Sequence, residues 1–358
     1  MKRLTDIICQ LGKRQLALRG LDEGVDSIDR GNYVELVHVL RKYDHKLNVH
    51  LENSTLLTGL SKRIQNDLTD SISDVILTEI KREVSSAAFV AVMVDEMTNI
   101  RSQSQLSIVL RYATSDSEIQ EQFLGFSDVS ADRTASALAE RVTDCVVQYD
   151  FGSKIVAQTY DGRRVLQDFN FNFLLSVFRD LFSATTFLFD MLQAKSNSKR
   201  PQRKRLINYR VNDCVLTFLK SPFLSLNTAY GQHFNFPRLR SELSVFNFNK
   251  DLNIQNESQL LLHLKPTNID SALRQLTKLC ELIVTIPASS ASVERSFSAL
   301  KRIKTYARNS QGEGRMSRLS LLSSEKKLLE HIRNNEGFYD HVNNNFAAKD
   351  RRIDLFFK

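Results

Sequence analysis

The sequence predicts an α/β protein in which a mixed sheet carries helical regions before and after it. The strongest observation is the order of patterns in residues 88–161, which indicates three strands, a helix and a fourth strand. A second is the helical spacing of apolar residues in the chain that leads into this block. A third is the same helical spacing after residue 270, interrupted by a single proline.

Residues 1–84 are dominated by helix formers and show no strong β pattern. Over residues 61–82 the apolar side chains recur every three or four positions, which predicts an amphipathic packing helix that leads into the first strand. These side chains are Ile64, Leu68, Ile72, Val75, Ile76 and Ile80.

The first three strands of the block follow from two different patterns. Residues 88–95 are a short apolar run rich in β-branched side chains, which is typical of a strand buried on both faces. Residues 105–112 alternate between apolar and polar, and residues 121–129 do so loosely, so both are expected to be half-buried strands. The loop at residues 114–117 suits a tight hairpin between two of them.

The fourth strand is expected after a helix. Residues 134–148 place apolar and small side chains at helical spacing behind a capping threonine, and residues 155–161 then form a strand pattern. A helical crossover returns the chain to the sheet parallel to a central strand, so this strand should run parallel to the first. If the two are neighbours, Asp95 and Asp161 lie side by side at the carboxyl edge of the sheet.

Two carboxylates at one sheet edge suit a divalent metal site. Mg²⁺ or Mn²⁺ would relieve the repulsion between Asp95 and Asp161, activate a water molecule and hold a phosphodiester for in-line attack. The alternative is purely structural, because an aspartate at the end of a strand often caps the loop that follows. Spacing alone leaves both interpretations open.

The middle of the chain carries less chemistry. Residues 168–193 are crowded with phenylalanine and leucine, which predicts a largely buried helix or helix pair. The basic run at residues 199–205 fits a nuclear-import patch, a phosphate-contacting loop or a solvated linker. Residues 206–265 have weak periodicity and are expected to form short helices joined by loops.

Helical patterns return at residues 271–284 and 290–304, separated by a turn at Pro287. In the second of these helices Glu294 lies about 100° around the axis from Val293, so it can face a sheet edge.

A further helix is predicted over residues 315–333. It carries an apolar stripe wide enough to require a partner helix, and this stripe comprises Met316, Leu319, Leu321, Leu322, Leu328, Leu329 and Ile332. The apolar tail at residues 353–357 would be exposed unless another segment covers it. The stripe and the tail together predict self-association through the C-terminal third, although the stripe could instead pack within the chain.

Composition excludes several classes of protein. No stretch reaches the roughly 18 apolar residues of a membrane span, and the first residues lack the apolar core of a signal peptide. The four cysteines show no zinc-site spacing, which favours a reducing, intracellular compartment without a disulfide framework. The net charge of +8 favours polyanionic partners only modestly.

At residues 286–301 the sequence IPASSASVERSFSALK resembles the C-terminal signature of hAT-superfamily transposases, and residues 315–325 are similar to the dimerisation helix of that family. Four upstream motifs resemble the zinc-finger-MYM-type-like branch of the superfamily: GNYVEL at 31–36, MVDEMTN at 93–99, QLSIVLRY at 105–112 and QTYDG at 158–162. The resemblance touches both ends and most of the chain.

The resemblance implies a ribonuclease-H-like core in which Asp95, Asp161 and Glu294 match the three carboxylates that bind two metal ions for DNA cleavage and transfer. It also implies a nuclear location, a homo-oligomer and DNA as a candidate partner. With this assignment the chain divides into a helical N-terminal region (1–84), the first part of the core (85–165), a shortened helical insertion (166–285), and a C-terminal core helix with the dimerisation region (286–358).

Several departures from the family pattern bear on activity. Only about 130 residues separate Asp161 from Glu294, where relatives carry a large helical insertion. The small-residue turn and the Cys/His motif of relatives are absent after Gly162, as are tryptophan and an N-terminal zinc finger. We therefore expect a domesticated or relic transposase-derived protein that no longer cuts DNA. An active metal-dependent transposase or nuclease and a nuclear DNA- or chromatin-binding regulator are the alternatives.

Overall fold

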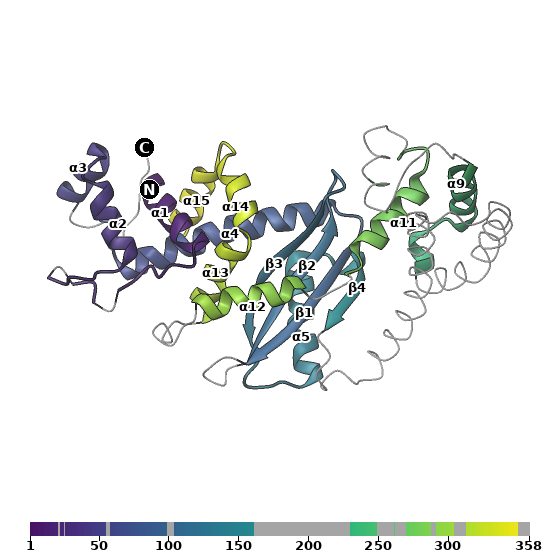
Figure 1. The fold of residues 1–358 in the computed structure, drawn as a ribbon, viewed down its shortest axis with the longest axis horizontal. Helices are drawn as coiled ribbons and strands as arrows, with labels where there is room; N and C mark the ends of the chain where they lie inside the picture. The colour runs from purple at the N-terminus through teal and green to yellow at the C-terminus, as the bar shows by residue number, and fades with distance from the viewer. Residues whose placement is uncertain are drawn as a thin grey trace, which may run out of the picture.

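The computed structural model is centred on a four-stranded mixed sheet with the strand order β3-β2-β1-β4 (Figure 1). It describes residues 1–160, 230–248, 261, 270–303 and 313–349, except residues 21, 25, 55–57, 99–103 and 288–290. The strands are β1 (Val90–Thr98), β2 (Ser104–Ala113), β3 (Ile119–Asp128) and β4 (Ile155–Tyr160).

The strand directions confirm the predicted topology. β1 pairs antiparallel with β2, β2 pairs antiparallel with β3, and β4 lies beside β1 and parallel to it. The crossover helix α5 (Ala135–Tyr149) begins where the sequence predicted, because the Thr134 hydroxyl accepts the amide hydrogen of Ala137 and satisfies one of the unpaired donors of the first turn. β1 is buried through Val94, in keeping with its apolar sequence.

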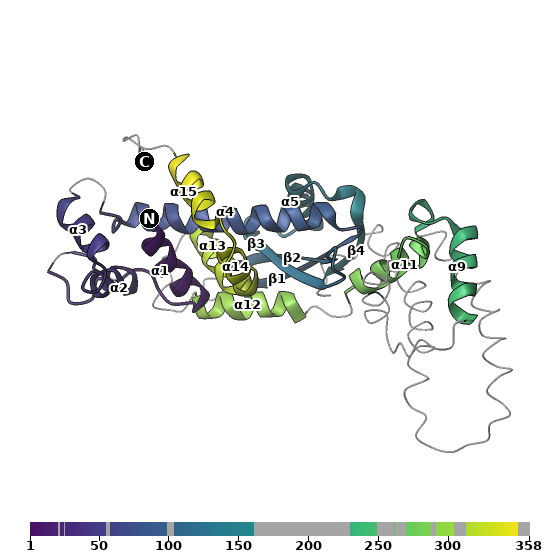
Figure 2. The same ribbon diagram turned by 90° about the horizontal axis from the view of Figure 1, so that it is seen from above.

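Helices cover both faces of the sheet, as Figure 2 shows. The long helix α4 (Lys62–Ser86) lies with α5 over one face, and α12 (Ala291–Ile303) lies over the other. The predicted amphipathic face of α4 is its buried face, and the hydroxyl of Ser61 caps its first turn by accepting the amide hydrogen of Ile64.

Two further groups of helices extend the molecule in opposite directions (Figure 1). At the N-terminal end α1 (Lys2–Lys13), α2 (Asn32–Leu40) and α3 (His45–Asn53) lie around the start of α4. Beyond β4, the short 3₁₀ turn η2 (Gly231–His233) leads into α9 (Phe236–Phe248), which packs on α11 (Arg274–Thr285). A second 3₁₀ turn, η1 (Gly152–Lys154), precedes β4.

The helix expected over residues 315–333 is two helices in the structure, α13 (Glu313–Ser324) and α14 (Lys326–Arg333), followed by α15 (Phe338–Ala347). The break falls at Glu325, whose carboxylate is drawn into the core, where it accepts the amide hydrogen of Phe123 at 2.6 Å.

The apolar stripe of this region is buried within the chain, so the prediction that it forms an exposed oligomer interface is wrong. Leu322 and Leu329 are both fully buried, and α13 packs against α1, α4, α12 and β3. A Cβ atom at Gly12 of α1 would lie 2.6 Å from Leu322 Cδ2, so only glycine allows the two helices to approach this closely. Substituting Leu322 or Leu329 by aspartate would therefore unfold the chain rather than dissociate an oligomer.

α13 also protects the outer edge of the sheet. β3 is an edge strand, and two of its backbone amides donate to side chains of the C-terminal helices: Phe126 to the hydroxyl of Ser317 at 2.9 Å, and Phe123 to Glu325. An unprotected edge would offer these amides to other chains. The C-terminal region is thus part of the sheet's own architecture.

Several sequence predictions concern residues outside those the structure describes. These are the phenylalanine-rich segment 168–193, the basic run 199–205, most of the segment 206–265, and the apolar tail 353–357.

Candidate functional site

The candidate site begins where β1 leaves the core. Val94 is buried and pairs with Tyr160 of β4, and Asp95 follows it with a half-buried side chain whose Oδ1 accepts the amide hydrogen of Glu96 at 2.7 Å. Asp161 follows Tyr160 in the sequence and lies outside the described residues. The parallel pairing of β1 with β4 is the arrangement on which the prediction of neighbouring carboxylates rests.

The register shows which face of the sheet Asp95 uses. Asp95 lies directly opposite Ser107 of β2, and side chains in such cross-strand pairs project from the same face. The hydroxyl of Ser107 is hydrogen-bonded to the hydroxyl of Ser296 at 2.7 Å, and Ser296 belongs to α12. Asp95 therefore lies on the face that α12 covers.

Glu294 lies in the first turn of α12, two residues before Ser296, and its side chain is exposed. The predicted helix and its packing on the sheet are confirmed, since α12 contacts β1, β2 and β3. The stripe of Val293, Phe297, Leu300 and Ile303 faces inward, and Phe297 stacks on Phe126 of β3. The fold thus brings Asp95 and the helix that carries Glu294 to the same face.

Glu96, the next carboxylate along β1, is used differently. Successive side chains of a strand point to opposite faces, so Glu96 leaves the face that Asp95 shares with α12. Its carboxylate forms an ion pair with Arg133 at 2.6 Å, in the segment that leads into α5. The two adjacent acidic residues consequently have separate surroundings.

A polar cluster beside α12 was not predicted from the sequence. Glu121 of β3 pairs with Arg111 directly opposite on β2, accepts a hydrogen bond from the Ser292 hydroxyl, and pairs with Arg295 at 3.0 Å. Arg111 also donates to the backbone carbonyl of Val284 at 2.9 Å, which ties α11 to the sheet. The sequence does show opposite charges at Arg111 and Glu121 in the two predicted strands. Only the strand register, which the sequence does not give, shows that they are neighbours.

The carboxylates suit a hard divalent cation such as Mg²⁺ or Mn²⁺, which prefers oxygen ligands. Among the residues that the structure describes, no group of three or more His, Cys, Asp or Glu side chains is placed to hold a metal ion. Because Asp161 lies outside that set, the three-carboxylate site of Asp95, Asp161 and Glu294 stays a prediction.

Comparison with known protein families accounts for both halves of this architecture. Residues 1–171 match the family model described as ZMYM1/FAM200, RNase-like domain, and residues 238–328 match the hAT family C-terminal dimerisation region. Residues 238–328 thus resemble the C-terminal region of hAT proteins. The first match ends shortly after β4, and the second runs from α9 through α11, α12 and α13 to the start of α14, so the core joins strands and helices from both matched regions.

A curated relative supports the same assignment at greater distance. The human 52 kDa repressor of the inhibitor of the protein kinase is 24% identical to this chain over 139 residues, which cover 37% of the chain and 18% of the relative. The aligned part is thus less than a fifth of that protein. Separately, none of the helices in the described part of the chain is both long and apolar enough to cross a membrane.

Proposed function

We propose that this chain is a hAT-derived protein that self-associates through its C-terminal region and no longer cuts DNA. The observation that carries the first half of the proposal is the match of residues 238–328 to a dimerisation region. The relevant surface is not the apolar stripe of α13 and α14, because those side chains are buried in the chain's own core.

The lobe formed by α9 and α11 is the part of the matched region best suited to the role. Glu242 of α9 is buried and accepts the amide hydrogens of Gln275 and Leu276 at 2.7 and 2.8 Å, so it caps the first turn of α11 from a neighbouring helix. This link fixes α9 on α11. Val245 of α9, with 63% of its surface exposed, then presents an apolar side chain to the solvent.

Sedimentation velocity tests this surface. The wild-type chain should associate reversibly at micromolar concentration, and Val245→Asp should weaken association at least tenfold because it places a charge in an apolar contact. Val147→Asp is a matched control, since Val147 of α5 is 73% exposed and lies outside the matched region. A wild-type chain that remains monomeric, or a Val245→Asp variant that associates as the wild type does, would contradict the proposal.

Loss of cleavage is proposed from the sequence. Only about 130 residues separate Asp161 from Glu294, where relatives of the resembled family carry a larger helical insertion. The chain also contains no tryptophan to stack on a base flipped out near the cut. Stacking of this kind contributes about 1 to 3 kcal/mol per base. Without it we expect the chain to position DNA too weakly for strand transfer, even if all three carboxylates bind metal.

The second candidate function is a metal-dependent nuclease, which the parallel pairing of β1 and β4 favours because it supports neighbouring positions for Asp95 and Asp161. The decisive assay is nicking of supercoiled plasmid with Mg²⁺ or Mn²⁺. We expect no activity above that of an Asp95→Asn, Glu294→Gln double variant. Mn²⁺-dependent nicking by the wild type that Asp95→Asn abolishes would replace our proposal with the nuclease.

A nuclear DNA- or chromatin-binding role is the remaining proposal, and the net charge of +8 is compatible with it. Titration of a labelled duplex at several salt concentrations tests DNA binding separately from cleavage, because phosphate contacts weaken steeply as salt rises.

A further inference from the structure

The end of the molecule farthest from the α9–α11 lobe carries an apolar surface that the proposed function does not use (Figure 1). On α2, on the turn that follows it and on α3, five large apolar side chains are exposed, and we call them the α2–α3 face. They are Leu36 (36%), Val39 (48%), Leu40 (39%), Tyr43 (85%) and Val49 (37%).

The face is ordered as a helical stripe. Leu36, Val39, Leu40 and Tyr43 are spaced by three and four residues, and the backbone stays helical beyond α2 because Arg41 and Tyr43 donate to carbonyls of the preceding turn. The adjacent side of α2 is also apolar, but there Tyr33, Val34 and Val37 are buried in the core. α2 is therefore apolar on two sides, of which only one is covered.

The face is held in place by the chain itself. The hydroxyl of Tyr33 donates to the Gly59 carbonyl at 2.9 Å, and Arg41 donates to Asn48 at 2.9 Å across the two helices. Asp44 caps α3 by accepting the amide hydrogen of Leu47 at 3.0 Å. A partner would meet a preformed surface and would not need to order it.

Charge around the face is one-sided. Its acidic residues are engaged within the chain, as Glu35 pairs with Arg30 at 3.1 Å, Asp44 with Arg3 at 2.5 Å and Glu52 with Arg41 at 3.5 Å. Among the residues that the structure describes, no ion-pair partner is found for the exposed Lys42 and Lys46. The surroundings of the apolar stripe are therefore electropositive.

We propose that the α2–α3 face binds an amphipathic helix of a partner protein, with the apolar side of that helix on Leu36, Val39, Leu40 and Tyr43 and acidic residues along its margin facing Lys42 and Lys46. Helix-on-surface recognition of this kind uses apolar anchors at the spacing found here. A second copy of the chain is disfavoured, because both copies would bring the same positively charged surroundings to the contact.

The probe for this proposal is a fluorescent 18-residue peptide with leucines at helical spacing and glutamates at the other positions, measured by fluorescence anisotropy with the full chain. Two control peptides define specificity: one with the same composition scrambled to remove the helical period, and one with lysine in place of every glutamate. The acidic amphipathic peptide should bind at least tenfold more tightly than either control.

Variants of the chain assign the binding site. Leu40→Asp should weaken binding at least tenfold, and Lys42→Glu with Lys46→Glu should weaken it several-fold and reduce its salt dependence. Val147→Asp, an exposed apolar position on α5, should bind as the wild type does. Thermal melts of every variant show whether the fold is retained.

Four results would overturn the proposal. The first is a failure of the acidic amphipathic peptide to bind, and the second is equal binding of the scrambled peptide. The third is an unchanged affinity in a folded Leu40→Asp variant. The fourth is a loss of another kind of binding in Leu40→Asp. If this variant no longer self-associates in sedimentation, the face binds a second copy of the chain, and if it no longer binds vesicles of anionic phospholipid, the face binds a membrane. Because α9 and α11 lie at the other end of the molecule, failure here leaves the proposed self-association through these helices standing.

Discussion

Glu325 is the residue whose chemistry differs most from what its sequence neighbourhood suggests. It sits between two helices and is 7% exposed, and burial, together with the nearby charge of Glu83, raises the pKa of its carboxyl to about 8. The amide of Phe123 donates to it and opposes part of this shift. Glu83 in turn accepts the hydroxyl hydrogen of Tyr112 at 2.7 Å, so one polar group from β2 shares this buried region.

This shift makes a prediction for stability against pH. The folded chain holds a proton on Glu325 up to about pH 8, whereas the unfolded chain releases it near 4.5, so the stabilisation is full below pH 4.5 and is lost as pH rises towards 8. The free energy of unfolding should thus fall by up to about 1.4 kcal/mol per pH unit in this window from this group alone.

Urea unfolding of Glu325→Gln at several pH values checks this prediction. Glutamine keeps an acceptor for Phe123 without a charge, so the variant should gain stability relative to the wild type as pH rises from 5 to 8. Glu336→Gln is the matched control, because Glu336 is exposed and its substitution should leave the pH profile unchanged. A constant difference between Glu325→Gln and the wild type across this range would refute the shift.

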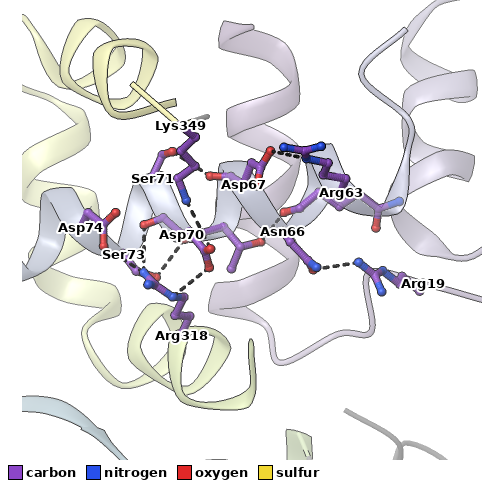
Figure 3. A network of polar contacts seen from close by, with 12 residues as sticks. Arg19, Arg63, Asn66, Asp67, Asp70, Ser71, Ser73, Asp74, Arg318 and Lys349 are labelled. Carbon is purple, nitrogen blue, oxygen red and sulfur yellow. Dashed lines mark hydrogen bonds and ion pairs between the residues drawn. The ribbon is translucent and has the colours of Figure 1, made fainter. Parts of the chain in front are cut away.

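At the scale of elements, α4 is joined to the C-terminal helices by ion pairs and by burial. Figure 3 shows Arg318 of α13 reaching Asp70 and Asp74 of α4, at 2.8 and 2.9 Å, with Lys349 on Asp70 at 3.2 Å. These side chains are partly exposed, and exposed pairs contribute about 0 to 1 kcal/mol each. Fully buried Leu322, on the same helix, should contribute more.

Single substitutions decide between the two effects. We expect Leu322→Ala to lower the free energy of unfolding by about 2 to 5 kcal/mol, the range for a leucine deleted from a packed core. Arg318→Ala should cost about 0 to 2 kcal/mol, because it removes two pairs that are open to solvent. Chemical denaturation measures both, and a larger loss for Arg318→Ala than for Leu322→Ala would show that the ion pairs dominate this contact.

For the whole molecule, the main apolar core runs from Leu4 of α1 through the sheet to Phe346 of α15. α1 and the C-terminal helices therefore belong to one cooperative unit with the strands, although they lie 300 residues or more apart in the chain. The C-terminal helical region also supplies the hydrogen-bond acceptors for two backbone amides at the edge of β3, those of Phe123 and Phe126.

Truncation tests this interdependence. A chain that ends at residue 312 lacks α13, α14 and α15, which uncovers α4 and the edge of β3, and we expect it to be insoluble or to lose the cooperative thermal transition. A chain that ends at residue 349 keeps every helix described here and should melt as the full chain does. A soluble 1–312 chain with the full-length transition would contradict a shared core.

The sequence by itself determined the order of the strands, the crossover helix, the amphipathic α4 and the helix that carries Glu294. Each of these follows from the local spacing of apolar residues or from a capping residue such as Ser61 or Thr134. The parallel direction of β4 follows from the helical crossover that precedes it. The motif around Glu294 also indicated the resemblance to hAT proteins that the match of residues 238–328 confirms. Local patterns were sufficient because they record which face of an element is apolar.

Only the tertiary structure decided what covers each of those faces. The stripe containing Leu322 and Leu329 had the spacing of an interface, yet it is the chain's own core, whereas the similarly spaced Leu36, Val39, Leu40 and Tyr43 are exposed. Likewise the Arg111–Glu121 pair, with Ser292 and Arg295 beside it, depends on strand register and on how α12 crosses the sheet. The physical reason is the same in each case: burial and pairing are properties of two surfaces in contact, and a sequence period describes only one of them.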